Sequence, residues 1–135
     1  MKVLTSKKKF EIRLNNDNNC IELEYKDIIA VKDFRKILGK VYDYSVENKT
    51  TKNLVDMRKM GMIPPEAQKW IESDWFPKMI QAGVLTYGMV VAQSAAAQAS
   101  TEDLTEKIDD QREAGGVKNG FFGSLDDARK WIAEQ

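Results

Sequence analysis

Apolar and charged residues alternate over residues 10–14 and again over residues 21–25, and this pattern constrains the fold most. A period of two places alternate side chains on opposite faces of a β-strand, so each run predicts a strand with one apolar and one polar face. Residues 15–19, between the runs, are all Asn or Asp, which tolerate turn backbones. The sequence therefore predicts an antiparallel hairpin, whose acidic and basic side chains meet across the strands in a structural role.

Helical spacing follows the hairpin. Apolar residues recur three and four positions apart over residues 31–47, which predicts a helix covering one face of the sheet. Residues 53–56 predict a short strand, and residues 64–82 predict a second helix. Pro77 predicts a kink near Ser73, because the proline ring clashes with the carbonyl four residues earlier.

The second half of the chain continues this alternation of strands and helices. Residues 84–91 are almost continuously apolar, which predicts a central strand buried on both faces. The alanine-rich region beginning at residue 94 predicts a helix reaching about residue 112. Residues 117–122 predict a last strand, with a hairpin turn at Asn119-Gly120 as the alternative. Residues 125–133 predict a final helix capped by Ser124.

This order predicts an α/β fold with one sheet of about five strands and about four helices. The sheet is expected to be mostly parallel, with the antiparallel hairpin at its N-terminal side. With 135 residues, of which 42% are hydrophobic and 31% charged, the chain fits one domain spanning residues 1–135. Residues 1–8 are expected to form a frayed terminus, and the lysine run at 7–9 is expected to be solvated there.

Composition excludes several classes of chemistry. The chain has no histidine, which excludes Ser-His-Asp and Cys-His nucleophiles and His-ligated metal sites. Its one cysteine, Cys20, cannot form an internal disulfide and is expected to pack in the core. Lys plus Arg equals Asp plus Glu, at 21 each, so no basic field favours nucleic acid.

Neither metal nor cofactor is expected, and the chain carries no predicted membrane span. The acid pairs Asp109-Asp110 and Asp126-Asp127 fit helix surfaces better than metal or catalytic sites, because helical neighbours point apart. No glycine loop of the phosphate-binding pattern is present. The longest apolar stretch, residues 83–92, is roughly half of what crosses a bilayer. With no signal-peptide core, we expect a cytoplasmic protein.

Motifs spread along the chain resemble a known family. They are residues 54–60, Pro65, Glu66, Trp70, Ile71, 74–77 and 82–84, then Phe122, Leu125, Asp126, Ala128, Trp131 and Ile132. From about residue 10 to residue 132 the chain resembles small bacterial proteins of the STAS superfamily, which has the fold of anti-sigma-factor antagonists. The resemblance implies a protein-binding module without catalytic turnover, which docks on a partner protein such as a kinase-like anti-sigma factor.

The chain departs from that family at its regulatory switch. In the antagonists, an acid at a strand end is followed closely by the serine that accepts phosphate. Here Asp56 is followed by Met57 and Arg58, and no Ser or Thr occurs before Ser73. We therefore do not expect phosphorylation of this loop in the antagonist manner.

The candidate partner-binding residues lie at and after the carboxyl end of the strand at 53–56, where open α/β sheets place their sites. A charged pair flanked by methionines offers an adaptable docking surface, and an exposed tryptophan is a common interface anchor. The alternatives are that the acid caps the loop, that the arginine lies over apolar surface, and that the tryptophan covers the core rim. The candidates are Asp56, Met57, Arg58, Lys59, Met60 and Trp70.

Three functions stay open from the sequence. The first is the non-catalytic interaction module, for which exposed helix faces would allow a homodimer. The second is a carrier of a small apolar ligand or lipid, since STAS domains are similar in topology to the CRAL-TRIO fold. Its pocket would use the Met-rich loop, Phe76, Ile80 and the alanine-rich segment. An enzyme is not expected, although a site built on carboxylates or lysine is not forbidden.

Trp75 and Trp131 fit apolar helix stripes and are expected to pack in the core.

Overall fold

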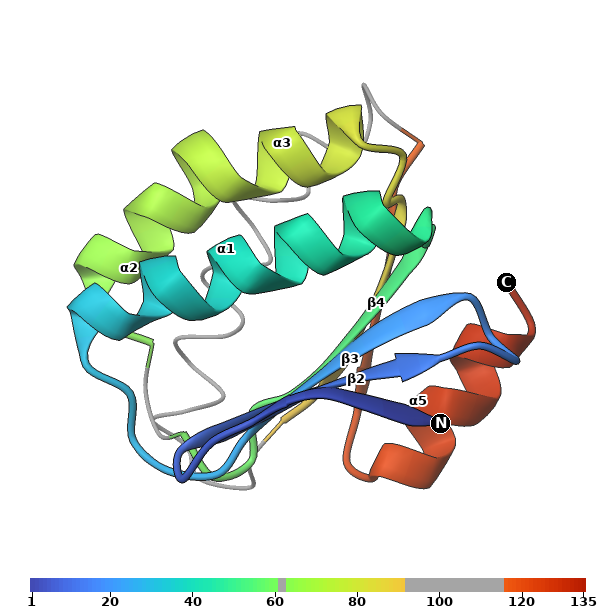
Figure 1. Ribbon diagram of the computed structural model, residues 1–135, viewed down its shortest axis with the longest axis horizontal. Coiled ribbons are helices and arrows are strands. Elements are labelled where there is room, and N and C mark those ends of the chain that lie inside the picture. Colours follow the sequence, from blue (N-terminus) through green and yellow to red (C-terminus); the bar gives the residue numbers. More distant parts are fainter. Residues whose placement is uncertain (61–62, 92–115) are drawn as a thin grey trace.

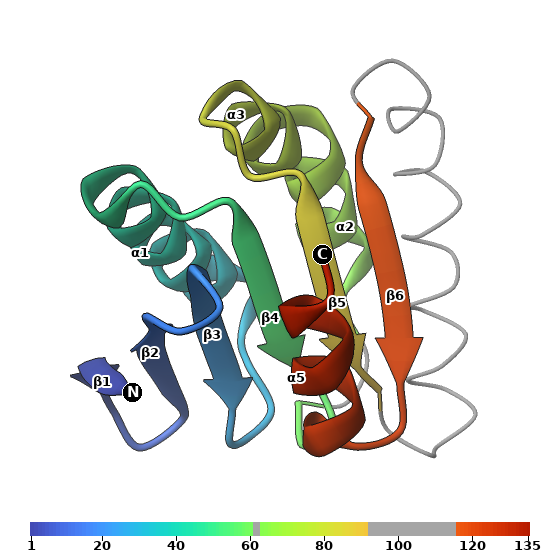
Figure 2. The same cartoon turned by 90° about the vertical axis from the view of Figure 1, so that its right-hand side faces the viewer.

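In the computed structural model, which describes residues 1–60, 63–91 and 116–135, one six-stranded sheet separates two helical layers. The strands lie in sequence order from β1 to β6, as Figure 2 shows. The helical segments between residues 31 and 81 cover one face of the sheet, and the C-terminal helix packs on the other (Figure 1). The α/β class, the mixed sheet and the N-terminal hairpin agree with the sequence-based prediction.

The antiparallel part of the sheet has three strands. β2 (Phe10–Asn15) pairs with β3 (Cys20–Tyr25), as predicted from the alternating pattern. β1 (Lys2–Ser6) pairs with β2, so the expectation of a frayed terminus is wrong for this segment. Besides the backbone pairing, the hydroxyls of Thr5 and Tyr44 lie 2.6 Å apart and join β1 to the first helix. A sequence pattern of only five residues does not reveal such a long-range contact.

The parallel part comprises β3, β4 (Lys52–Asp56), β5 (Thr86–Val90) and β6 (Lys118–Phe122). Every residue of β5 is buried, as its continuous apolarity predicts. β6 runs parallel to β5, so the hairpin turn considered at Asn119-Gly120 is not formed. The sheet therefore presents the carboxyl ends of four neighbouring strands at one edge.

The first helix, α1 (Val31–Asn48), matches its predicted range and buries Phe34, Ile37, Leu38 and Val41 against the sheet. The second predicted helix is divided into α2 (Pro65–Trp70), a π-helical turn η1 (Ile71–Trp75) and α3 (Phe76–Gln81).

Pro77 explains this division. It occupies the first turn of α3, where its missing N–H and fixed φ are tolerated. Within η1 the bonding changes register, and the Phe76 N–H donates to the carbonyl of Ile71, five residues back. A π-helical turn therefore includes Ser73, where the kink was predicted.

The last helix, α5 (Leu125–Ala133), lies against β4, β5 and β6. Ser124 caps it as predicted, since its Oγ accepts a hydrogen bond from the Asp127 N–H at 3.2 Å. A small second core forms beneath it from Cys20, Leu54, Val90, Ala128 and Ile132. Gly88 permits this close packing, because a Cβ there would lie 3.1 Å from Leu54 and 3.3 Å from Ile132.

Two predictions fall on residues 92–115, which lie outside the described residues. These are the helix over residues 94–112, with its alanine-rich start, and the acid pair Asp109-Asp110. Among the helices of the described residues, none is both long enough and apolar enough to cross a membrane.

Candidate functional site

At the carboxyl end of β4, the predicted site residues Asp56 and Arg58 bind each other. Asp56 is 5% exposed, and its Oδ1 accepts hydrogen bonds from the Arg58 backbone N–H at 3.2 Å and from Nε at 3.0 Å. Oδ2 accepts from Arg58 Nη2 at 2.7 Å. This hydrogen bonding raises the pKa of Arg58, which stays charged. Asp56 therefore caps its loop, as the structural alternative predicts, and its carboxylate already has partners.

The methionines of this loop face the interior. Met57 is 6% exposed and Met60 is 2% exposed, so they do not form the expected docking surface. The sequence pattern misses this because a flexible apolar side chain near charges suits a surface and a core wall equally well. Only Arg58 and Lys59 are exposed among the loop candidates.

Trp70, the remaining candidate, lies at the edge of the core. It is half-buried and packs against the main apolar cluster, and the Arg35 guanidinium of α1 lies 5.7 Å from its ring centroid. This arrangement matches the alternative reading of Trp70 as a rim residue.

The buried methionines instead line a cavity between the sheet and the segments α1 to α3. Its volume is about 60 Å³. The wall is aromatic and aliphatic, with two asparagine side chains among its members. Phe76 lines this cavity, as the ligand-carrier hypothesis expects, while Ile80 packs elsewhere on the core. The principal wall residues are Phe34, Met57, Met60, Trp75, Phe76 and Met89.

The two asparagines lie on either side of a tyrosine. In the strand register, Asn53 of β4 stands opposite Tyr87 of β5, which stands opposite Asn119 of β6, and all three line the cavity. Asn53 is fully buried. Its Nδ2 donates to the Ile21 carbonyl at 3.2 Å, but its Oδ1 has no partner.

Neither amide atom of Asn119 has a hydrogen-bond partner within the described part of the chain. Leaving a buried polar atom unsatisfied costs about 1–3 kcal/mol, so three such atoms beside one cavity call for an explanation. Sequence reasoning passed over these asparagines, although Asn is uncommon inside strands and two strands with an internal Asn were a usable signal.

The cavity is electrically neutral. No Asp, Glu, Lys or Arg of the described residues lines it. Burial raises the pKa of both Tyr25 and Tyr87, which keeps these phenols protonated. The Tyr87 hydroxyl donates to the Val84 carbonyl at 2.6 Å, and Trp75 Nε1 donates to the Leu38 carbonyl at 2.7 Å. Asn53 and Asn119 are the wall residues whose buried amide atoms lack a partner in the described part of the chain.

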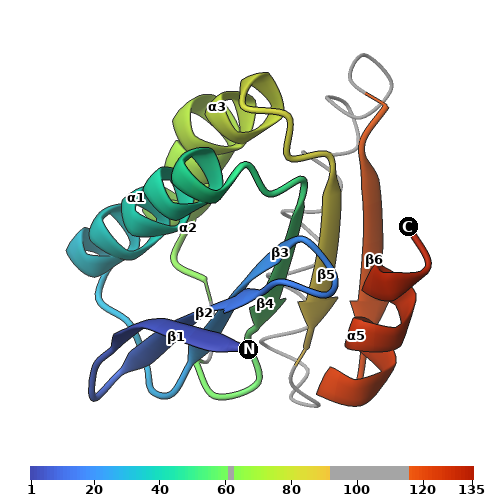
Figure 3. The same ribbon diagram turned by 45° about the vertical axis from the view of Figure 1, so that its right-hand side comes forward.

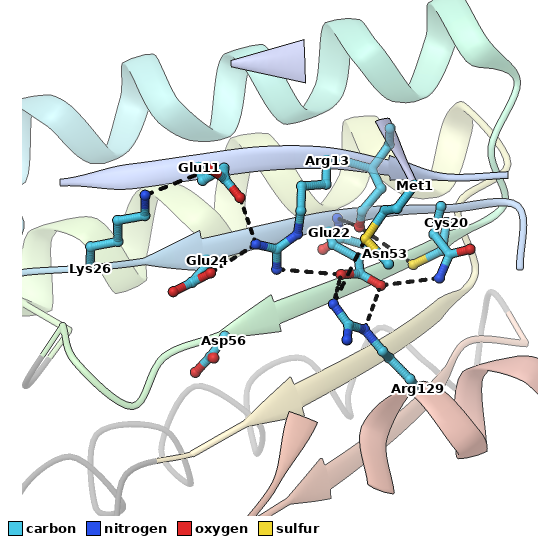
Figure 4. A network of polar contacts seen from close by, with 12 residues as sticks. Met1, Glu11, Arg13, Cys20, Glu22, Glu24, Lys26, Asn53, Asp56 and Arg129 are labelled. Atoms are coloured by element: carbon cyan, nitrogen blue, oxygen red, sulfur yellow. Dashed lines mark hydrogen bonds and ion pairs between the residues drawn. The ribbon is translucent and has the colours of Figure 1, made fainter. Parts of the chain in front are cut away.

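A second polar cluster occupies the opposite face of the sheet (Figure 4). Arg13 Nη1 donates to Glu11 and Glu24 at 2.8 Å each, and Nη2 lies 3.4 Å from Glu22. Glu22 also accepts from Arg129 of α5, at 2.9 Å from Nη2 and 3.1 Å from Nε. The predicted meeting of charges across the hairpin is confirmed.

Glu22 lies on the predicted polar face of β3, but it is buried. Its exposed fraction is 1%, because the side chains of Arg13 and Arg129 cover it. Asn15 Nδ2 donates to Glu22 Oε2 at 3.2 Å. The hydrogen bond from Arg13 lowers the pKa of Glu11. With its carboxylates paired inside the fold, this cluster is a structural connection between β2, β3 and α5.

The other candidates have structural places. Asp126 and Asp127 are exposed in the first turn of α5, where negative charge suits the helix dipole. Trp75 is 6% exposed and packs in the core as predicted, whereas Trp131 is half-buried against Phe122 at a centroid distance of 5.5 Å. Cys20 is fully buried, and burial raises the pKa of its thiol. Over the described residues, no group of three acidic or cysteine side chains could hold a metal.

Comparison with known proteins adds no relative. A scan against protein-family models and searches of curated proteins and of solved structures find no match for this chain. The resemblance to STAS proteins therefore stays a prediction from the quoted motifs.

Proposed function

We propose that this chain is a non-catalytic binding module that holds a small neutral molecule in the cavity between the sheet and α1 to α3. The observation that carries the proposal is the Asn53 amide, fully buried with an unpartnered oxygen beside an apolar cavity. Most small-molecule sites combine an apolar wall with a few polar groups that orient the ligand. Asn53 and Asn119 supply those groups here.

The cavity size limits the occupant. A cavity needs roughly 10–15 Å³ to hold one water, and an engineered cavity of about 150 Å³ binds benzene. A volume of about 60 Å³ therefore fits a molecule of a few heavy atoms or a short water cluster. This argues for the small-ligand form of the carrier hypothesis and against a lipid chain.

The cavity wall could adapt to a somewhat larger molecule. Met57, Met60 and Met89 are unbranched and can repack without leaving the core. Since Asn53 offers an acceptor and Asn119 offers a donor and an acceptor, a ligand with an amide-like group would pair with them best.

The test is a titration of the protein, labelled with ¹³C at its methionine methyl groups, with acetamide and acetate. These probes have similar shapes but only acetamide is neutral at pH 7. We expect acetamide to shift the signals of Met57, Met60 and Met89. Met79 is the internal control, because it is buried but does not line the cavity.

A variant makes this test specific. Asn53→Leu removes the unpartnered oxygen, so it should abolish the acetamide response while the Met79 signal stays in its folded position. Equal responses to acetate and acetamide, or an unchanged acetamide response in the variant, would contradict the proposal. Native mass spectrometry of freshly purified protein would additionally show whether a small molecule is retained.

Docking of a protein partner at Arg58 and Lys59 is a second candidate function, in line with the resemblance to STAS modules. It is favoured by the Arg58 side chain, which is 42% exposed although Asp56 fixes its orientation. Preorganised arginines lose less entropy on binding than free ones. In an affinity pull-down, an Arg58→Ala, Lys59→Ala variant should lose its partner, whereas the Lys130→Ala control should retain it. A cytoplasmic location and a homodimer are further proposals of this reading.

A further inference from the structure

Five lysines from two distant parts of the chain surround one groove. Lys7, Lys8 and Lys9 form the turn between β1 and β2, and Lys36 and Lys40 project from α1. All five are exposed, and the groove between them has a volume of about 350 Å³. Figure 3 shows this turn at the same end of the molecule as the start of α1.

The floor of this lysine groove is apolar. Phe10, Ile29 and Ile37 line it, and Ile29 is 4% exposed while Ile37 is 3% exposed. Asp33 is the one acidic residue in the lining. The groove therefore combines an apolar base with a strongly cationic rim.

None of the five lysines forms an ion pair in the described residues, where the paired cations are Arg13, Lys26, Arg58 and Arg129. What distinguishes these lysines is that five of them surround one groove. The whole chain has equal numbers of acids and bases, so this local excess is not a consequence of net charge. Like charges held close together repel one another, and an anion in the groove would relieve that repulsion.

The dimensions favour a small occupant. From Asp33 to Lys40 the helix wall rises about 10 Å. A square patch with the roughly 800 Å² per partner that a stable protein interface buries would be about 28 Å on each side. A volume of about 350 Å³ lies within the range of small-molecule sites.

We propose that the lysine groove binds a small anionic amphiphile, with the anionic head at the lysines and its apolar chain on Phe10, Ile29 and Ile37. A carboxylate or a phosphate head would satisfy the lysines equally well, since lysine recognises both as a point charge. The proposal does not depend on the cavity beside Asn53, which lies on other residues.

Calorimetric titration can test the groove with four probes. Decanoate and decyl phosphate, both below their micelle concentrations, carry the charge and the chain; 1-decanol carries only the chain and acetate only the charge. We expect both anionic amphiphiles to bind and the other two probes to bind at least tenfold more weakly. A Lys36→Glu, Lys40→Glu variant should weaken decanoate binding about tenfold, which lies below the upper limit of about 25-fold for two surface ion pairs of up to about fivefold each.

The control variant Lys69→Glu, Lys130→Glu makes the same change in net charge away from the groove and should leave decanoate affinity unchanged. Equal loss in both variants would overturn the proposal, as would decanol binding as tightly as decanoate. Binding to phosphatidylserine vesicles without any binding of monomeric decanoate would assign the lysines to a membrane surface and would also overturn it. Unfolding midpoints for both variants verify that they are folded, and Asn53→Leu should not alter decanoate binding.

Discussion

Glu22 of β3 and Asn53 of β4 are buried polar residues on neighbouring strands. They differ in whether their side-chain oxygens have hydrogen-bond partners. Glu22 is 1% exposed and accepts hydrogen bonds from Arg13, Asn15 and Arg129. Asn53 is 0% exposed and makes one hydrogen bond, leaving its Oδ1 unpartnered. The charged residue is fully satisfied, whereas the neutral one is not.

The difference follows from the cost of desolvation. An unpaired buried carboxylate is prohibitively unfavourable, so it persists only inside a complete network. An unpaired amide oxygen costs far less, so a fold can retain it where a ligand or water will bind. The Glu22 carboxylate has its partners inside the fold and therefore fits a structural role, even though Arg13 Nε in the same cluster is unpartnered. The unpartnered amide atoms beside the cavity are those of the proposed binding site.

The largest expected loss of stability comes from placing a charged side chain at residue 53, beside the cavity. Asn53→Asp would bury a carboxylate without a cationic partner, which should destabilise the fold by about 3–5 kcal/mol at pH 7. Burial should raise the pKa of the new carboxyl above its unfolded value, so stability should recover as the pH falls through that raised pKa. Urea unfolding at pH 7 and pH 4 measures this.

Asn53→Leu is the matched control for that substitution. It removes the unpartnered oxygen together with one hydrogen bond, so it should change stability by no more than about 1 kcal/mol at either pH. If Asn53→Asp is no less stable than Asn53→Leu at pH 7, the cavity tolerates charge and the contrast with Glu22 fails.

A slightly smaller loss of stability is expected from removing one of the hydrogen-bond partners of Glu22. Arg129→Ala removes both hydrogen bonds from α5 to Glu22, leaving a buried carboxylate with Arg13 at 3.4 Å and Asn15. We expect a loss of about 3 kcal/mol in the free energy of unfolding. Lys130→Ala, exposed on the same helix, should change it by less than about 0.5 kcal/mol. Equal stabilities of the two variants would show that Glu22 does not need Arg129.

The smallest effect concerns acid pH. The pKa of Glu11 is lowered in the folded state, chiefly by its hydrogen bond with Arg13, so the folded state releases this proton more readily than the unfolded state. Its contribution is present above the unfolded pKa of about 4.3 and is lost as the pH falls through the lower folded pKa. Urea unfolding at pH 7 and at acid pH should therefore show that Glu11→Gln loses less unfolding free energy on acidification than the wild type, by up to about 1 kcal/mol. An equal loss in the variant and the wild type would argue against that coupling.

Local patterns predicted much of this fold correctly. The hairpin, α1, the break at Pro77 and the Ser124 cap each depend on residues close together in sequence, so periodicity and capping chemistry were sufficient. The strand at Lys2–Ser6 was missed because its residues lack the alternating pattern of β2 and β3; its evidence is the pairing with β2 and the contact with Tyr44.

Site prediction was less successful for a physical reason. Asp56 and Arg58 were correctly placed at a strand end, but whether they face a partner or each other depends on side-chain geometry. Met57 and Met60 were expected at the surface and are in the cavity wall.

The amino-acid sequence by itself determined the α/β class, the order of most elements and the exclusion of histidine-based chemistry, because these follow from local periodicity and composition. Only the tertiary structure decided which polar groups are satisfied. Arg129 reaches Glu22 across more than a hundred residues of chain, whereas Asn53 and Asn119 line one cavity without pairing. Hydrogen-bond satisfaction is a property of three-dimensional neighbours, and it is what separates the Glu22 carboxylate from the Asn53 amide.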